Sequence, residues 1–300
     1  MKLVHLNEAT EAELYGRKAV NLGVAIEHSL PVPNGYVLSA SIIMQFVQGE
    51  LNIEGEIRSM LDSLGSVSVR SSAIQEDGEQ SSYAGLFHSC LNVTSVKGIE
   101  RAIRYIWESA QSKRLHSYMS RAEGATTIDN GVPSVRMAVI VQQMINSDVS
   151  GIMFTRNPVT YEDERVIEAT WGLGEAVASG YVTPDYFRMN RNGEITESTA
   201  SLKEIAVRFG QWEGTIDHKL DDNIVNSLCL TAEQCSQLNC LAVKCEQTFG
   251  PNIDMEWTFA DDKLWLLQCR RITVLKPKVS CESIYPRNTP APAVEYPFED

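Results

Sequence analysis

Apolar residues along the chain recur in two spacings, one typical of helices and one typical of strands. Ile99, Ile103, Ile106 and Ala110 recur every three or four residues, the spacing that places side chains on one face of a helix. Helices are predicted over residues 12–30, 40–64, 97–121 and 232–249. Short apolar runs predict strands over residues 36–38, 67–71, 135–144, 151–155, 165–170, 185–189, 253–259 and 264–270.

This order of elements predicts the α+β class, with an antiparallel sheet at the C-terminal end. Thr231 and Gln234 form a capping box before the helix at 232–249, and Gly250 followed by Pro251 ends it. A chain of 300 residues is long enough for two compact lobes. Five of the 11 prolines follow residue 276, so residues 276–300 are predicted to form a linker or tail.

The net charge of −13 excludes some partners. An acidic surface disfavours binding to nucleic acid or to an anionic membrane, so neither is expected as a partner. A small anionic ligand remains compatible with this charge if a few Lys and Arg residues stand in specific places. The N-terminus lacks an apolar signal segment, and the seven cysteines include no C-x-x-C pair. These features predict a cytoplasmic protein with reduced core thiols.

The segment 253–270 carries the most informative local pattern, that of a β-hairpin. Apolar residues alternate with Asp254, Glu256 and Thr258, so these polar side chains share one face of the first strand. A two-residue turn at 261–262 would pair Glu256 with Leu267 and mix the faces. A three-residue loop at 261–263 keeps one face apolar, so this register is predicted.

The predicted register pairs Met255 with Cys269, Trp257 with Leu267, Phe259 with Trp265, Glu256 with Gln268, and Asp254 with Arg270. Glu256 and Gln268 then present a carboxylate oxygen beside an amide oxygen, which are ligands suited to Mg²⁺ shared with phosphates. The alternative is a solvent-facing Glu–Gln pair next to an ordinary cross-strand ion pair. The hairpin alone leaves both interpretations open.

Eight short motifs occur in an order that resembles one known family. The hairpin residues DMEW at 254–257 and LQCRRIT at 267–273 resemble its D-x-E-W and Q-x-R-P-I-T motifs. The remaining motifs lie at residues 16–23, 33–36, 69–93, 141–144, 150–155 and 171–185. The set resembles the N-terminal ATP-binding domain of phosphoenolpyruvate synthase, pyruvate phosphate dikinase and rifampin phosphotransferase. This resemblance implies a bilobal ATP-grasp-type fold, with lobes at 1–145 and 146–275.

The resemblance also implies site residues for ATP and Mg²⁺. Lys18 and Arg70 would contact the triphosphate, and Arg270 would neutralise the transferring group; these are the candidate catalytic residues. The segment around Gly85 and Ser89 would lie over the phosphates.

The remaining implied residues are Gln142 at the adenine hinge between the lobes, and Glu256 and Gln268 as Mg²⁺ ligands.

Each of these residues also has a simpler interpretation. Lys18 at a helix start is commonly solvated, and Arg70 can pair with Asp77 or Glu76. Gln142 can satisfy a buried backbone group. The loop at 171–175 can shape the acceptor side or serve only as a glycine-containing turn.

Two substitutions and one missing feature depart from the family pattern. Arg17 replaces a family glycine and Arg271 replaces a proline, and both changes are expected to be tolerated. Full-length relatives carry a phosphate-carrying histidine in a glycine-rich setting. None of the five histidines here has that setting, and His88 is interpreted as a loop residue.

The leading prediction is therefore the ATP-cleaving component of a dikinase-type phosphotransferase. Its phosphoryl or pyrophosphoryl group would pass to a carrier histidine on another polypeptide or on a further part of a longer chain, and then to an unidentified small molecule. A stand-alone ATP-dependent small-molecule kinase or ligase is the first alternative. A non-catalytic nucleotide-binding module is the second.

Overall fold

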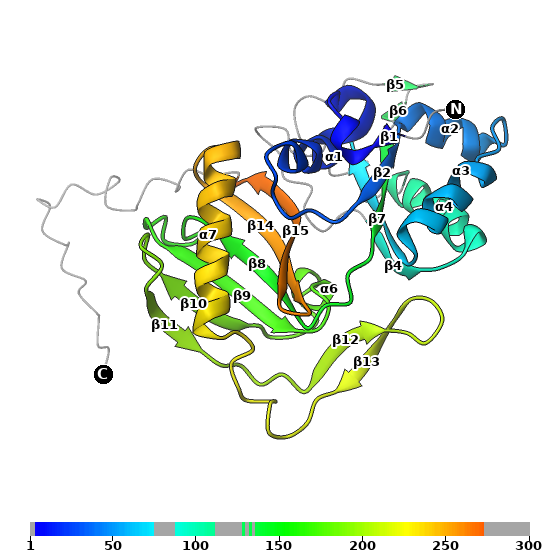
Figure 1. Cartoon of the computed structure of the whole chain (residues 1–300). Helices are drawn as coiled ribbons and strands as arrows, with labels where there is room; N and C mark the ends of the chain where they lie inside the picture. The colour runs from blue at the N-terminus through cyan, green and yellow to red at the C-terminus, as the bar shows by residue number, and fades with distance from the viewer. Residues whose placement is uncertain (1–3, 75–87, 112–127, 130–131, 134–135, 273–300) are drawn as a thin grey trace, which may run out of the picture.

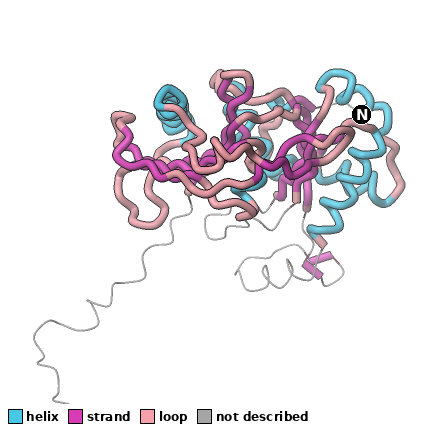
Figure 2. The backbone as a smooth tube through the Cα atoms, turned by 90° about the horizontal axis from the view of Figure 1, so that it is seen from below, coloured by secondary structure: helices cyan, strands magenta, loops and turns pink. Residues whose placement is uncertain are grey.

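The computed structural model describes residues 4–74, 88–111, 128–129, 132–133 and 136–272. Its described part contains two larger antiparallel sheets, each covered by helices, which confirms the α+β class (Figure 1). Figure 2 shows most helices gathered at the end of the molecule that carries the N-terminus. Among the helices of the described residues, none combines the length and the apolar character that a membrane span requires.

The first sheet has the strand order β1-β2-β7-β3-β4. Its strands are β1 (Val4–His5), β2 (Gly35–Leu38), β7 (Met137–Gln143), β3 (Val67–Ala73) and β4 (Ser89–Val93). One face packs on α2 (Ala40–Gln48), α3 (Glu54–Leu64) and α4 (Val96–Ala110). Val69, Val139 and Val141 on that face are fully buried. Apolar residues at every second strand position produce this core because strand side chains alternate between faces.

The second sheet has the strand order β11-β10-β9-β8-β14-β15. Its strands are β11 (Ile195–Thr199), β10 (Asp185–Met189), β9 (Arg165–Trp171), β8 (Val149–Phe154), β14 (Ile253–Ala260) and β15 (Lys263–Arg271). The helix α7 (Ala232–Phe249) lies across one face and buries Cys235, Leu238, Ala242 and Cys245 (Figure 1). These cysteines are free thiols within the core, as the sequence predicts.

Smaller elements complete the described fold. They are η1 (Leu6–Glu8), α6 (Glu175–Ala178), the hairpin β12 (Ile205–Phe209) with β13 (Thr215–Lys219), and the short pair β5 (Ile128–Asp129) with β6 (Val132–Pro133).

The first helix, α1 (Ala12–Glu27), joins the two halves of the molecule. Ala19, Leu22 and Ala25 pack into one core together with residues of α7, β14 and β15. The chain passes from the first sheet to the second between β7 and β8. The helix α1 comes from the N-terminal half, yet it contributes to a core shared with the second sheet.

Two helix predictions differ from the structure, and a third is described only in part. The predicted helix at 12–30 is interrupted at Gly16, whose φ of 76° is non-helical. The predicted helix at 40–64 is two helices, because Gly49 adopts the left-handed conformation and ends α2. The helix α4 is described to Ala110, and the rest of the predicted segment to residue 121 lies almost entirely outside the described residues. The sequence does not predict the strands β1, β4, β5, β6, β11, β12 and β13.

The hairpin β14–β15 combines both registers considered from the sequence. Met255 pairs with Cys269, Glu256 with Gln268, and Asp254 with Arg270, as predicted. Beyond Glu256 the register shifts at a β-bulge, so Trp257 pairs with Leu266 and Phe259 with Leu264. The predicted three-residue loop and the pairs Trp257–Leu267 and Phe259–Trp265 are therefore wrong.

The bulge changes which residues of β15 enter the core. Leu266 becomes fully buried, and the turn is a two-residue one at Asp261 and Asp262, whose φ values are 49° and 60°. Two consecutive residues with positive φ match the type I′ turn, whose twist suits a tight hairpin. Trp265 lies outside the apolar core, with Lys263 Nζ 3.7 Å from its ring centroid.

Candidate functional site

Arg70 brings the two sheets together at one point. It lies on the face of β3 opposite Val69, and its guanidinium reaches the hairpin β14–β15. Nη2 donates to Glu256 Oε2 at 2.8 Å and to Gln268 Oε1 at 3.2 Å. Nη1 donates to the backbone carbonyl of Leu267 at 2.7 Å. The structure thus unites three residues that the sequence predicts to share a site, from positions nearly 200 apart in the chain.

The bulge in β15 supplies the third of these hydrogen bonds. Leu267 is the extra residue at the register shift between Glu256 and Trp257, so it has no directly opposed partner in β14. Its carbonyl oxygen accepts from Arg70. A planar guanidinium with several N–H groups can donate to the carbonyl, the carboxylate and the amide together, which an ammonium group cannot do with the same geometry.

Lys18 reaches the site because α1 is broken just before it. At Gly16 any side chain would collide with Ser72 of β3, so this close approach of backbone requires glycine. Ser72 Oγ donates to the carbonyl of Tyr15 at 2.7 Å and accepts from the amide of Ala19 at 3.2 Å. The second part of α1 therefore begins at β3, which carries Arg70 on the same face as Ser72.

Arg270 is paired within the hairpin. Its Nε lies 2.9 Å from both carboxylate oxygens of Asp254, and the two side chains are 23% and 14% exposed. The cross-strand ion pair considered from the sequence is therefore present. A role for Arg270 toward a transferring group stays a prediction, and the ion pair fixes the position of its charge for that role.

The positive charges act together on Glu256. Burial alone would raise the pKa of this carboxyl group, but attraction by Arg70, Lys18 and Arg270 outweighs burial and lowers the pKa below its usual value. All three candidate catalytic residues therefore direct positive potential at the same carboxylate. Glu256 is ionised at neutral pH and presents a full negative charge.

The remaining predicted site residues differ in how the structure describes them. Gln142 is buried on β7, and its Nε2 donates to the carbonyl of Pro33 at 3.2 Å, which matches the simpler interpretation of a satisfied buried group. Ser89 opens β4 directly opposite Arg70. Gly85 lies outside the described residues, as do Asp77 and Glu76. The adenine and phosphate-loop roles stay predictions.

The oxygens of Glu256 and Gln268 match the ligands that Mg²⁺ prefers. Both lie within 3.2 Å of a single nitrogen of Arg70, so they converge on one cationic group. Within the described residues no group of three or more His, Cys, Asp or Glu side chains could hold a metal ion. Magnesium commonly takes only one or two protein ligands and completes its shell with phosphates and water. The donor set therefore fits a magnesium ion bound together with a phosphate ligand.

Most of the residues at this junction lie in a part of the chain that matches a known family. The family model "Pyruvate phosphate dikinase, AMP/ATP-binding domain" matches residues 50–288, which is more than half of the chain. The chain belongs to this family. Membership agrees with the ATP-grasp-type fold that the resemblance implies. The matched span contains Arg70, Glu256, Gln268 and Arg270, and it begins after Lys18.

Three curated relatives show how much of a longer protein this chain matches. The uncharacterized phosphotransferase YvkC of Bacillus subtilis is 33% identical over 92% of this chain and 35% of that protein. A probable phosphoenolpyruvate synthase of Archaeoglobus fulgidus is 29% identical over 90% of this chain and 41% of that protein. Rifampicin phosphotransferase of Streptomyces sviceus is 38% identical over 70% of this chain and 23% of that protein. The chain thus spans less than half the length of each.

Two contributors to the site escaped the sequence prediction. Asn21 Nδ2 donates to the carbonyl of Cys269 at 3.0 Å and ties α1 to the site strand β15. The Leu267 carbonyl appears only because of the bulge. A backbone acceptor leaves no mark on the sequence, whereas Asn21 lies inside the motif at 16–23, which was a usable signal.

Proposed function

We propose that this chain is the Mg-ATP-binding component of a dikinase-type phosphotransferase. It binds Mg-ATP between the two sheets and passes a phosphoryl or pyrophosphoryl group to a carrier histidine. That histidine belongs to another polypeptide or to a further part of a longer chain. The observation that carries the proposal is the convergence of Arg70 from one sheet with Glu256 and Gln268 from the other.

The proposed chemistry depends on positioning and charge. Arg70 and Lys18 bind phosphate oxygens, and Arg270, held by Asp254, neutralises the transferring group. Glu256 and Gln268 hold the magnesium ion, which neutralises phosphate charge when bound. Phosphoryl transfer needs little covalent help from the protein, so these residues suffice for cleavage once the carrier is in place. The names of the relatives support transfer of this kind.

Turnover of labelled ATP tests this proposal. The purified chain is incubated with Mg-ATP alone, and then with separately expressed carrier domains that contain a histidine in the glycine-rich setting of the family. We expect label on the carrier only when both proteins are present, and loss of transfer in Glu256→Gln. The matched control is Glu233→Gln, an exposed glutamate in the first turn of α7.

The products separate the proposal from the other two functions. Formation of ADP and a phosphorylated small molecule without any carrier would identify a small-molecule kinase, and would contradict transfer to histidine. Tight binding of Mg-ATP with no turnover across carriers and acceptors would identify a nucleotide-binding module instead.

A further inference from the structure

The hairpin β12–β13 lies apart from both larger sheets and contacts each half of the molecule. In Figure 1 it lies below β4, and its strands form a separate two-stranded sheet. On one side it is fastened to the second half, because the amide of Leu173 donates to the carbonyl of Val207 at 2.9 Å. Arg208 Nη1 also donates to the carbonyl of Ser147 at 2.6 Å, within the connection between β7 and β8.

A small apolar core anchors this end of the hairpin. Val207 packs with Leu173 and Ala176, all of them less than 9% exposed. These three residues belong to the second half of the chain, and the partly buried Leu91 of β4 and Met144 from the first half pack against the same core. Burial of apolar surface therefore attaches the hairpin to the second half and also contributes to its contact with the first half.

The opposite end, the turn at residues 210–214, contacts the first half through polar groups. Glu213 Oε1 accepts from Ser95 Oγ at 2.6 Å and from the amide of Thr94 at 3.3 Å, at the start of α4. Arg101 Nη2 lies 3.3 Å from Glu213 Oε2. The hydrogen bond from Ser95, followed by the Thr94 amide and Arg101, lowers the pKa of Glu213 despite its partial burial. Glu213 is therefore an anion at neutral pH.

Asn92 fastens the same turn to the edge strand of the first sheet. Its Nδ2 donates to the carbonyls of Gly210 and Gly214 at 3.2 Å and 2.9 Å, and its own carbonyl accepts from the amide of Gly214 at 3.0 Å. Asn92 adopts a φ of 51°, a conformation that asparagine tolerates better than most residues. It lies on β4, the strand that pairs with β3 and thus with the strand of Arg70.

We propose that the turn at 210–214 is a releasable latch between the two halves, with Glu213 as a positioning residue that holds the sheet of Arg70 against β14–β15. The contacts that Glu213 makes to the first half are polar and accessible, with Arg101 and Glu213 side chains 75% and 32% exposed. Such contacts are individually weak and are screened by salt. Loss of the Glu213 contacts therefore frees the turn from the start of α4, while the contacts of the buried Asn92 and the apolar contacts of the hairpin remain.

The latch has a consequence for nucleotide binding, which rests on the proposed function. Arg70 meets Glu256 and Gln268 only while the sheets are held together. Weakening the latch lowers the fraction of molecules in this arrangement, and the apparent affinity for a ligand that needs it falls in proportion. Loss of two or three hydrogen bonds is expected to raise the apparent Kd for Mg-ATP about tenfold.

The test compares Glu213→Ala with Asp217→Ala on the same hairpin. Asp217 accepts from the Tyr181 hydroxyl at 2.6 Å, and both of these residues belong to the second half. Hydrogen–deuterium exchange of the nucleotide-free chain is measured over residues 92–95 and 210–214, together with small-angle scattering. We expect faster exchange in both segments and a larger radius of gyration in Glu213→Ala, and no change over 92–95 in Asp217→Ala.

Binding of Mg-ATP is then measured by calorimetry for the same proteins. Unchanged exchange in Glu213→Ala would overturn the latch. Faster exchange with an unchanged Kd would overturn its positioning role. If the wild-type chain bound no Mg-ATP, the proposed function would fail, whereas exchange and scattering would still decide whether the latch exists.

Discussion

At the scale of single residues, Arg70 has the largest effect on how the site is organised. Its side chain is only 12% exposed, and it donates to one carboxylate, one amide and one backbone carbonyl of the opposite sheet. Charge-assisted hydrogen bonds of this kind are stronger than neutral ones, and their planar geometry cannot be reproduced by lysine. Charge alone is therefore insufficient at position 70.

Arg70→Lys should weaken Mg-ATP binding although it conserves the positive charge. The variant cannot keep all three donor contacts, so we expect a loss of about 2 kcal/mol, roughly a thirtyfold rise in Kd. Calorimetric titration with Mg-ATP measures this rise. The control is Arg58→Lys, which alters an exposed i,i+4 pair with Glu54 and should leave Kd unchanged. Equal Kd values for Arg70→Lys and the wild type would contradict the need for a guanidinium group at position 70.

The lowered pKa of Glu256 predicts how the stability of the fold changes with pH. Its pKa is lower in the folded protein than in the unfolded chain, so ionised Glu256 stabilises the fold above the unfolded pKa, roughly 4.3. That contribution disappears as the pH falls through the lower, folded-state value.

We expect the stability difference between wild type and Glu256→Gln to be constant near neutral pH and to shrink below about pH 4. Urea unfolding of both proteins between pH 3 and 7 measures the difference. A difference that grew on acidification would mean that the pKa of Glu256 is raised instead.

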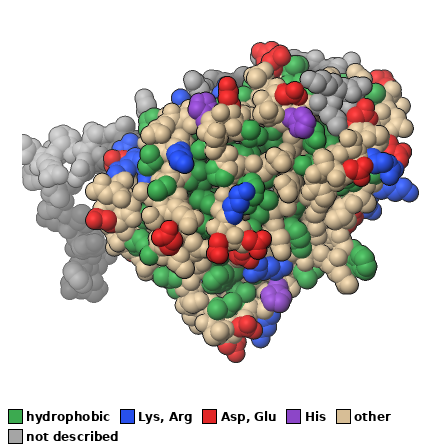
Figure 3. Space-filling view, viewed as in Figure 1, with side chains coloured by type: hydrophobic (Ala, Val, Ile, Leu, Met, Phe, Trp, Pro, Cys, Tyr) green, Lys and Arg blue, Asp and Glu red, His purple; other side chains and the backbone are tan. Residues whose placement is uncertain are grey.

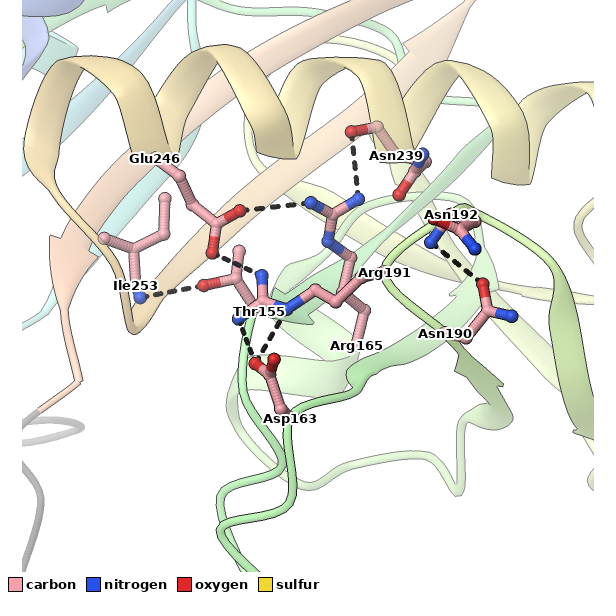
Figure 4. A network of polar contacts seen from close by, with 9 residues as sticks. All are labelled: Thr155, Asp163, Arg165, Asn190, Arg191, Asn192, Asn239, Glu246 and Ile253. Atoms are coloured by element: carbon pink, nitrogen blue, oxygen red, sulfur yellow. Dashed lines mark hydrogen bonds and ion pairs between the residues drawn. The ribbon is translucent and has the colours of Figure 1, made fainter.

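At the scale of elements, α7 is held to the second sheet by charge as well as by its apolar face. Glu246 of α7 accepts from Arg165 at 3.0 Å and from Arg191 at 2.7 Å (Figure 4). Arg191 also contacts Asp163, and Arg165 donates to the carbonyl of Asn239. The network thus joins α7 to β9 and to the turn between β10 and β11.

Glu246→Gln should destabilise the fold because it removes the carboxylate that lies 3.0 Å from Arg165, whose side chain is only 2% exposed. Removing one member of a buried ion pair costs about 3 kcal/mol, since the remaining charge stays desolvated. The urea midpoint at neutral pH reports this loss. The exposed Glu233→Gln change in the same helix should cost less than about 1 kcal/mol. Equal midpoints for the two variants would show that the network contributes no net stability.

At the scale of the whole molecule, the net charge of −13 is not what selects a ligand. On the face seen in Figure 3, Lys and Arg side chains are interspersed with Asp and Glu. The positive potential that acts on the site comes from Lys18, Arg70 and Arg270, which three different elements bring to Glu256. An acidic protein can therefore hold an anionic nucleotide at one local site.

Mg-ATP should stabilise the entire chain because its proposed contacts come from both sheets. At a ligand concentration of a hundred times Kd, binding adds about 2.7 kcal/mol, which corresponds to a rise in Tm of about 5 °C or more. Thermal unfolding followed by circular dichroism measures the rise. ATP with a chelator, and Arg70→Ala with Mg-ATP, serve as controls and should show much smaller shifts. A full shift in Arg70→Ala would place the nucleotide elsewhere.

The sequence by itself determined the elements whose signals are local. The capping box of Thr231 and Gln234 starts α7, and alternating polar residues in β14 and β15 oppose Glu256 to Gln268. Periodicity and capping act within a few residues, so they can be recognised without a fold. The ordered motifs added Lys18, Arg70 and Arg270 to the same predicted site.

Only the tertiary structure decided the features that depend on distant contacts. The break in α1 at Gly16 depends on the close approach of Ser72. The bulge at Leu267 places Leu266 in the core and lets the Leu267 carbonyl accept from Arg70. The hairpin β12–β13 gains its contacts from β4 and α4, more than 100 residues earlier. A helix pattern or a turn length is a local preference of about 1 kcal/mol, and the packing of buried side chains across the fold outweighs it.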